Sequence, residues 1–270
     1  MCQVLEVSRS GYYDWCGRGE SRRSVRDKVL IKEIRKVHES HKEAYGTVKT
    51  WLTLKEVGVT CGKHRVARLR SLTGIETRRR RRFRLAYKAR HSAPPAPNLL
   101  RQRFEAPGPD QVWMADITFI ATRSGWLYLA VVVDLYSRLV VGWSMKDRPT
   151  QELVSEALLM AIEQRKPTAG LVHHSDQGFQ YSTNQYAELI KRYGVVRSMS
   201  RKGNCYDNAV VESFFSSLKN ELVHHQDYQT RQEARSDIFD YIELFYNRRR
   251  KHESLGYHTP TAYDEIKHVA

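Results

Sequence analysis

Long apolar runs are missing from this sequence of 270 residues. The longest, Leu127–Val133, is far shorter than the roughly 18 residues of a membrane-spanning helix, so no membrane partner is expected. The chain opens without the apolar segment and small-residue cleavage site of an export signal, which predicts a cytoplasmic protein. Cysteines are few and scattered, which argues against a disulfide framework and suits a reducing compartment. They are Cys2, Cys16, Cys61 and Cys205.

Acidic residues are scarce in the first part of the chain. Residues 1–103 contain 26 Lys and Arg against 9 Asp and Glu, whereas residues 104–270 contain 19 against 21. The formal net charge of +15 therefore comes entirely from the first part, which favours a polyanion as its partner. The densest positive charge is a run of arginines that repel one another unless phosphates neutralise them: Arg78, Arg79, Arg80, Arg81 and Arg82. A solvated basic surface and a localisation signal are the alternative interpretations of this run.

Apolar spacing predicts that residues 1–88 form a small helical region. A helical period runs over residues 24–40, and two shorter helices follow it. Thr60 is the expected N-cap of the last helix. The expected buried face of that helix consists of Val66, Leu69 and Leu72.

The last of these helices is also basic. Two helices, a glycine-containing turn and a basic helix are together typical of a helix-turn-helix that binds DNA. Besides the arginine run, the candidate DNA contacts are Lys63, Arg65 and Arg68. The alternative is a three-helix unit without a DNA role, since such units are common.

Clustered prolines mark a linker at residues 89–105, and the pattern changes after it. Three closely spaced strands are expected as an antiparallel meander over residues 112–120, 126–134 and 139–145. A helix capped by Thr150, a strand near residues 170–174, a helix, a strand from Val195 and a long helix from about Asn208 follow. For residues 106–270 this order predicts an α/β fold, a ribonuclease-H-like mixed sheet flanked by helices.

Three carboxylates in this second region occupy positions that call for an explanation. Asp116 lies inside an otherwise apolar strand, where burying an unpaired charge is costly. Asp176 follows the fourth strand, at the kind of sheet edge where sites form in α/β folds. Glu212 comes 36 positions later on the long helix, beside an apolar stripe. The expected members of that stripe are Val211, Phe215, Leu218 and Leu222.

An all-carboxylate cluster favours Mg²⁺ or Mn²⁺ over softer metals. Mutual repulsion makes such a cluster unfavourable without cations, and two ions would turn it into a phosphodiester site. Asp134 is a competing carboxylate, although it is explained more simply as the end of a strand. The pair His173 and His174 could suggest zinc, but no cysteine pair lies near it in the sequence.

Basic and polar residues around the long helix are further candidates for DNA contact. Lys219 lies two turns after Glu212 and could hold a phosphate, or it could be a solvated charge. The polar loop before the helix is interpreted as a DNA-gripping loop, with a flexible surface loop as the alternative. Its candidate contacts are Arg201, Lys202, Asn204 and Tyr206. For Arg248–Arg250, DNA contact and a favourable position at a helix end are equally good explanations.

Several separate motifs together resemble one family. They are Trp113-Met-Ala-Asp116-Ile-Thr, His174-Ser-Asp176-Gln-Gly, the segment from Ser200 to Glu212, Lys219, and Tyr246-Asn-Arg-Arg-Arg. In this order, and over nearly the whole chain, they resemble the DDE transposases of the bacterial insertion sequence three family. The catalytic core of that family is similar to retroviral integrase.

The resemblance implies roles for the candidate residues. Asp116, Asp176 and Glu212 would be the catalytic triad that binds two Mg²⁺ or Mn²⁺ ions, and Lys219 would be the basic residue seven positions after the glutamate. The implied activity is the nicking and joining of element ends, in which a freed 3′-hydroxyl attacks another phosphodiester. The resemblance also implies a homo-oligomer on DNA in the bacterial nucleoid.

The arrangement of reading frames in this family bears on how such a chain would work. Members of this family usually act as a fusion with an upstream reading frame, and residues 1–40 contain no heptad run, so this chain resembles the downstream frame. Assistance from the upstream-frame product is therefore expected.

The alternative functions are a ribonuclease-H-type nuclease that cuts without joining, and a partial transposase product that binds DNA and regulates its own element without catalysis.

Overall fold

The computed structural model describes residues 2, 4–78, 96–101, 104–201 and 208–266. The chain forms two compact units, Met1–Thr77 and Arg78–Ala270. Each unit has its own hydrophobic core. The boundary expected at residue 88 and the first part of the expected linker fall within residues 79–95, outside the described residues.

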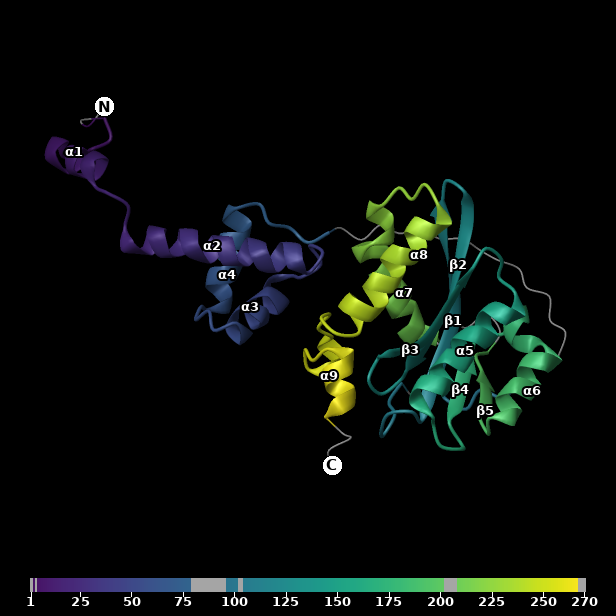
Figure 1. The fold of residues 1–270 in the computed structure, drawn as a ribbon. Helices are drawn as coiled ribbons and strands as arrows, with labels where there is room; N and C mark the ends of the chain where they lie inside the picture. The colour runs from purple at the N-terminus through teal and green to yellow at the C-terminus, as the bar shows by residue number, and fades with distance from the viewer. Residues whose placement is uncertain (1, 3, 79–95, 102–103, 202–207, 267–270) are drawn as a thin grey trace. The chain divides into compact units, whose positions relative to one another are not determined.

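Unit 1 is built from helices (Figure 1). They are α1 (Arg9–Gly17), α2 (Arg22–Ser40), α3 (Thr47–Glu56) and α4 (Lys63–Leu72). Serine caps begin the first two, because Ser8 accepts a hydrogen bond from the backbone N–H of Gly11 and Ser21 accepts one from that of Ser24. The core that joins α2, α3 and α4 consists of Leu30, Ile34, Val37, Tyr45, Leu54, Val66 and Leu69.

The predictions for α4 were correct in the middle of the helix and wrong at its two ends. Val66 and Leu69 are fully buried as expected. The N-cap is Gly62 rather than Thr60, and Leu72 is 71% exposed rather than buried. Leu72 is the last helical residue, and Gly74 then reverses the chain at a φ of 64°, a conformation that suits glycine. This turn brings Ile75 against the core in place of Leu72.

Unit 2 contains a five-stranded mixed sheet in the order β3-β2-β1-β4-β5. The strands are β1 (Val112–Thr122), β2 (Gly125–Asp134), β3 (Val140–Lys146), β4 (Val172–Ser175) and β5 (Val196–Met199). The first three form the expected antiparallel meander. β4 and β5 add to the other side of β1 in parallel, through crossovers that contain helices. The predicted order of elements and the ribonuclease-H-like fold are thereby confirmed.

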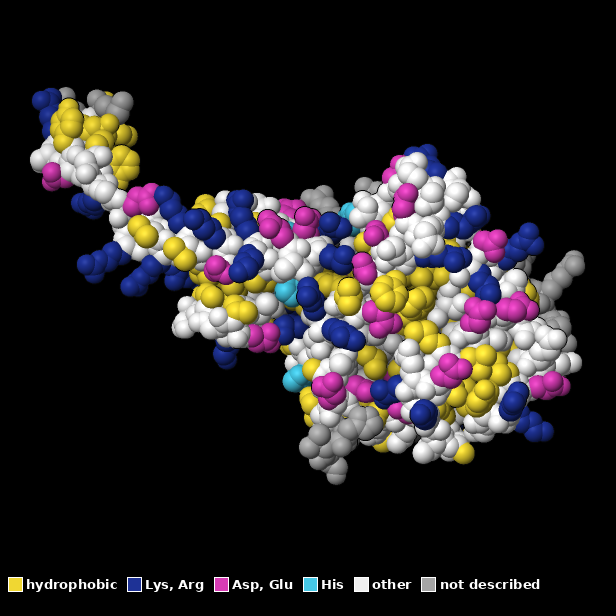
Figure 2. Space-filling model, viewed as in Figure 1, with side chains coloured by type: hydrophobic (Ala, Val, Ile, Leu, Met, Phe, Trp, Pro, Cys, Tyr) yellow, Lys and Arg dark blue, Asp and Glu magenta, His cyan; other side chains and the backbone are white. Residues whose placement is uncertain are grey.

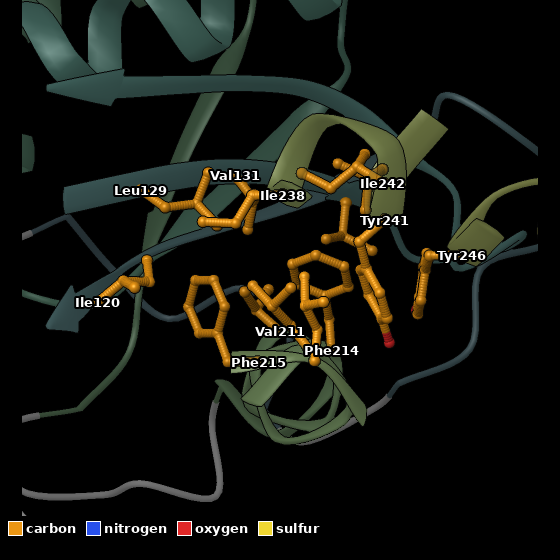
Figure 3. Packing of buried hydrophobic residues seen from close by; sticks show 14 of the residues in the cluster. Ile120, Leu129, Val131, Val211, Phe214, Phe215, Ile238, Tyr241, Ile242 and Tyr246 are labelled. Atoms are coloured by element: carbon orange, nitrogen blue, oxygen red, sulfur yellow. The ribbon is translucent and has the colours of Figure 1, made fainter. Parts of the chain in front are cut away.

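Helices cover both faces of this sheet (Figure 1). α5 (Gln151–Arg165) and α6 (Asn184–Arg192) pack on one face, and α7 (Ala209–Glu221) and α8 (Arg231–Asp240) pack on the other. Side chains of β1 alternate between the two cores: Trp113 and Ala115 lie in the α5 core, and Met114 and Ile120 lie in the α7 core. Figure 3 shows this α7 core, where sheet residues such as Val131 meet Phe214 and Phe215.

The chain after α8 binds back onto unit 2. α8 continues into a π-helix, Tyr241–Tyr246, and the last described helix is α9 (Pro260–Glu265). Asn247 continues the edge of β3, because its side-chain amide donates to the carbonyl of Val140 (3.1 Å) and accepts from its N–H (3.0 Å). Among the described residues, no helix combines the length and the apolar character needed to cross a membrane.

Candidate active site

The pairing of two parallel strands brings Asp116 and Asp176 together. β1 and β4 pair in a register that matches Ala115 with Ser175, so the two aspartates come next on adjacent strands. Asp116 lies in the middle of β1, as expected, and Asp176 lies just after the last residue of β4. Both side chains are half-buried. The sheet therefore holds two carboxylates side by side where β4 ends.

Burial and neighbouring charges act on Asp116 in the same direction. Burial raises the pKa of this carboxyl group well above its usual value, and the charges of Asp176 and Glu212 raise it further. The backbone N–H of Ile117, which donates to Oδ1 at 2.7 Å, and the charge of Lys219 oppose the shift. Asp116 is therefore costly to ionise until a cation approaches it.

A tight turn fixes Asp176. Its Oδ1 accepts a hydrogen bond from the backbone N–H of Gly178 at 2.8 Å. A Cβ atom added to Gly178 would lie 2.8 Å from the same oxygen and 3.0 Å from Oε1 of Gln180, so a larger residue there would push the Asp176 carboxylate from its position. The sequence analysis did not assign a role to Gly178, although the Asp-Gln-Gly motif could have indicated a turn around the carboxylate.

Helix α7 brings Glu212 to the same place. Its buried side is formed by Val211, Phe214, Phe215 and Leu218, which confirms the helical stripe except that Phe214 joins it. Leu222, the C-cap residue, is also buried. Glu212 is exposed in the first turn, and partial loss of hydration raises the pKa of its carboxyl group. Its charge raises the pKa of Asp116 less than the charge of Asp176 does, so α7 contributes a third, more weakly coupled carboxylate.

Lys219 is more than a solvated helix charge. It is half-buried, and burial lowers the pKa of its ammonium group whereas Asp116 raises it. Its Nζ also lies 5.0 Å from the centre of the Phe119 ring, a cation–π distance. Lys219 therefore brings positive charge to the margin of the acidic site.

The side chains of Asp116, Asp176 and Glu212 suit a hard cation. They supply only carboxylate oxygens, which are the ligands that Mg²⁺ and Mn²⁺ prefer. Within the described part of the chain, no three His, Cys, Asp or Glu side chains already form a cluster that could hold a metal ion. The aspartate pair is the formed part of the site, and Glu212 reaches it from an exposed position on another element.

The competing polar residues have structural roles. Asp134 accepts hydrogen bonds from the N–H (2.8 Å) and hydroxyl (2.9 Å) of Ser137 and from the N–H of Asp110 (2.8 Å), so it closes the turn after β2. Burial raises its pKa to about 6. His173 and His174 are fully buried and bond to Tyr186 and Ser198 respectively, so they are polar residues of the core.

The basic candidates are distributed over both units. Lys63 is exposed at the start of α4, whereas Arg65 and Arg68 both pair with Asp27 of α2. Arg78 is half-buried and donates to the carbonyl of Glu221 at 3.2 Å. Arg201 is exposed. Seven further candidates lie outside the described residues: Arg79, Arg80, Arg81, Arg82, Lys202, Asn204 and Tyr206.

Two features were missed by the sequence analysis. Lysines and arginines project along α2, as Figure 2 shows, and seven of them are exposed: Arg22, Arg23, Arg26, Lys28, Lys32, Arg35 and Lys36. Their helical spacing could have indicated a basic face. Arg250, which was left undecided, is a partly buried ion-pair partner of Glu221 at 2.8 Å, so it contributes to structure.

Comparison with known proteins finds family models that match residues of both units. Residues 106–205 and 212–267 match two models that are each described as Integrase core domain, and residues 24–83 match the HTH-like domain. The chain is 46% identical over 268 residues to the Insertion element IS600 uncharacterized 31 kDa protein of Shigella sonnei, covering 99% of this chain and 98% of that protein. It is 41% identical over 272 residues to Transposase InsF for insertion sequence IS3A of Escherichia coli, covering 98% and 92%.

A solved structure shows the same fold. The simian T-cell lymphotropic virus intasome, in complex with PP2A regulatory subunit B56 gamma, contains a chain that matches at a TM-score of 0.51 and 16% identity. The match covers 86% of this chain and 74% of that chain. The integrase core matches and the full-length relatives imply polynucleotidyl transferase activity. The chain therefore belongs to the IS3-family transposases and functions in DNA transposition.

Proposed function

We propose that Asp116, Asp176 and Glu212 are the catalytic DDE triad and that they bind two Mg²⁺ or Mn²⁺ ions. The observation that carries this proposal is a pair of carboxylates on adjacent strands, with a third carboxylate on α7 whose charge acts on one of them. Asp116 and Asp176 are neighbours in the register of β1 and β4, and the charge of Glu212 on α7 reaches Asp116. A repelling cluster of this kind is costly for the fold alone, and bound cations would offset that cost.

The reaction proposed is cleavage at the element ends followed by strand transfer. Bound ions would promote deprotonation of the attacking hydroxyl and stabilise the leaving oxygen. In cleavage, a water oxygen bonds to phosphorus, the bond to the 3′ oxygen breaks, and that oxygen takes a proton. In joining, the freed 3′-hydroxyl attacks a second phosphodiester and releases another 3′-hydroxyl. The three carboxylates would hold the ions, and Lys219 would hold a phosphate oxygen.

The basic residues are proposed to bind the DNA. In unit 1, the exposed start of α4 offers Lys63, and Arg65 and Arg68 follow along the same helix. In the segment that precedes α7 in the sequence, we assign DNA contacts to Arg201, Lys202, Asn204 and Tyr206. The arginine run Arg78–Arg82 would neutralise further phosphates. Their combined role implies binding that weakens steeply as salt is added.

The organisation of the chain is part of the same proposal. We assign residues 1–88 to DNA binding, residues 89–105 to a linker and residues 106–270 to catalysis. The protein would act as a homo-oligomer on DNA in the bacterial nucleoid, fused to or helped by the upstream-frame product. The support for this arrangement is the match of one domain model to residues 24–83 and of the core models to the rest.

A strand-transfer assay on DNA that contains the element ends tests the proposal. The chain would be used alone and fused to the upstream frame, with Mg²⁺ or Mn²⁺. We expect joined products that disappear in Glu212→Gln and persist in the matched control Glu163→Gln, which alters an exposed helical glutamate on α5. Cleavage without joining would instead favour the nuclease. DNA binding without chemistry in either form would leave a regulatory DNA-binding product.

A further inference from the structure

The tip of the β1–β2 hairpin extends beyond the other strands of the sheet (Figure 1). β1 pairs with β4 only as far as Ala115, and β2 pairs with β3 only from Tyr128 onward. β1 and β2 nevertheless pair with each other up to Thr122 and Gly125. Within the described residues, both edges of this tip therefore lack a neighbouring strand.

Two aromatic side chains lie on one face of the tip. Trp126 pairs with Ala121, which comes two residues after Phe119, so Phe119 and Trp126 share a side of the sheet. Their rings meet edge-on, with the ring centres 5.2 Å apart. Phe119 is half-buried, whereas Trp126 is 45% exposed. An indole that is held by a second ring thus remains accessible to a ligand.

Hydrogen bonds from the chain around the start of α8 hold the backbone of the tip. The N–H of Arg123 donates to the carbonyl of Tyr228 at 2.9 Å. Nε of Arg231 donates to the carbonyl of Trp126 at 2.9 Å, and the N–H of Arg231 donates to the hydroxyl of Ser124 at 3.2 Å. Because three bonds hold its backbone, the tip presents Trp126 at a defined place.

Lys219 connects the aromatic pair to the side of the sheet that carries the acids. Its Nζ lies 5.0 Å from the centre of the Phe119 ring. Phe119 alternates to the α5 side of β1 together with Ala115 and Ile117, whereas Lys219 comes from α7 on the other side. Since β4 pairs with β1 only as far as Ala115, the contact between lysine and ring passes the edge of β1 that β4 leaves open.

The aromatic pair lies a short distance from the acidic site. Asp116 is the first residue of β1 beyond the pairing with β4, and Phe119 follows three positions later, about 10 Å along the strand. Stacked nucleotides of one DNA strand rise about 3.4 Å each, so about three of them span this distance. A DNA strand bound at the acidic site would therefore reach the tip within a few nucleotides.

A cation beside an accessible indole suits a nucleotide. The ammonium group of Lys219 attracts a phosphate, and the indole of Trp126 offers an apolar surface on which a base can stack. In a double helix each base is already stacked between its neighbours, so only an unpaired or terminal base has a free face. The aromatic pair therefore fits an opened DNA end better than an intact duplex.

We propose that Trp126, supported by Phe119, is a stacking platform for an unpaired base of the DNA strand whose phosphate Lys219 holds. The inference rests on the proposed function and adds to it the form of the substrate, an element end whose last base pairs are opened. Stacking of this kind accepts any base, so the platform would sense whether a base is unpaired rather than which base it is.

Binding of three fluorescent duplexes to the full chain tests the platform, with EDTA present so that no strand is cut. The first duplex is blunt, the second ends in three mismatched thymine pairs, and the third has abasic sites in place of those thymines. The last two differ only in their bases and keep the same phosphates. The variants are Trp126→Ala, the conservative Trp126→Phe, and the matched control Tyr193→Ala, which alters a 41% exposed aromatic residue at the end of α6.

The expected results assign the effect to stacking. The wild type should bind the thymine fork about 10-fold more tightly than the abasic fork, and Trp126→Ala should lose this difference. Trp126→Ala should bind the abasic fork and the blunt duplex like the wild type, at a similar melting temperature. Trp126→Phe should keep most of the preference for the thymine fork, because a ring remains, and Tyr193→Ala should keep all of it.

Each other outcome overturns a defined part. If Trp126→Ala binds the thymine fork like the wild type, or if the wild type binds both forks alike, the platform is wrong. If Trp126→Ala weakens all three duplexes equally, or melts much lower, Trp126 supports the fold or a general DNA surface and the platform is again wrong.

The strand-transfer assay with Glu212→Gln tests the proposed function separately. Joining that depends on Glu212, without an effect of Trp126 on the forks, would remove the platform and leave the catalytic triad. A preference for the thymine fork that depends on Trp126, in a chain whose joining does not depend on Glu212, would leave the platform and remove the triad.

Discussion

Helix α7 carries two glutamates in opposite environments. Near its end, Glu221 is paired with Arg250 and accepts a hydrogen bond from the hydroxyl of Tyr241 at 2.8 Å, a group that we name the anchor. Near its start, Glu212 is exposed and its charge opposes that of Asp116. The same residue type thus has hydrogen-bond donors around it at one end of the helix and a neighbouring carboxylate near it at the other. Donors around a carboxylate indicate a structural role, and other carboxylates around it indicate a binding role.

The largest effect is expected from the acidic site. Asp116→Asn removes an oxygen ligand and should lower strand transfer about 10³-fold or more. The same change relieves burial of a charge and repulsion by Asp176, so the melting temperature should stay equal or rise. Gel assays and thermal melts of one preparation would check both. If Asp116→Asn instead lost activity together with a much lower melting temperature, Asp116 would stabilise the fold in the way that Glu221 of the anchor does.

At the anchor, a substitution is expected to lower the stability of the fold. Glu221→Gln breaks a mostly buried ion pair and should lower the free energy of unfolding by about 3 kcal/mol, because Arg250 keeps a charge without its partner. Denaturant unfolding would measure the loss, with the exposed Glu163→Gln as the matched control. Wild-type stability in Glu221→Gln would show that the anchor does not hold α7.

A smaller, pH-dependent effect is expected from Asp134. Its pKa is about 6 in the folded chain, above the 3.8 of the unfolded one, so its contribution to stability is highest below pH 4 and is lost as the pH rises through 6. The wild type should therefore lose about 1 kcal/mol relative to Asp134→Asn between pH 5 and pH 7. Urea unfolding at both pH values measures this difference. A constant difference would mean that Asp134 titrates alike in both states.

The smallest effect concerns unit 1. Asp27 pairs with Arg65 and Arg68, and these hydrogen bonds lower the pKa of its carboxyl group. Asp27→Asn should release both guanidinium groups for phosphates and strengthen DNA binding about two-fold, because exposed pairs of this kind are weak. Titration of a fluorescent duplex at two salt concentrations measures the gain. Weaker binding would show that Asp27 orients these arginines for DNA instead.

The elements that the sequence predicts well are those with local apolar patterns. The strands of the meander and the stripe of α7 follow from spacing alone, and the structure confirms both. The strands that would carry Asp116 and Asp176 were predicted in the same way, because an acid in an apolar strand is conspicuous. The sequence pattern did not predict that Ile75, rather than Leu72, packs against the core of unit 1. That choice depends on where Gly74 reverses the chain.

Contacts between distant residues were the hardest to predict. Arg250 and Glu221 are 29 positions apart, and no pattern in the sequence distinguishes Arg250 from Arg248 or Arg249. Tyr181 resembles any other aromatic residue of a core until the structure shows that its hydroxyl is buried without a hydrogen-bond partner among the described residues. Such roles arise from packing in three dimensions, which spacing along the chain does not encode.

The alternation of β1 couples the placement of Asp116 to correct folding. Asp116 lies on the same side of the strand as Met114 and Ile120, which belong to the α7 core. If β1 paired one residue out of step, every side chain would change face, so Asp116 would leave Glu212 and the core would lose Met114 and Ile120 together. A molecule with that error would lose its core and its carboxylate cluster in one event. Under the proposed function, a copy misfolded in this way would therefore also be unable to cut DNA.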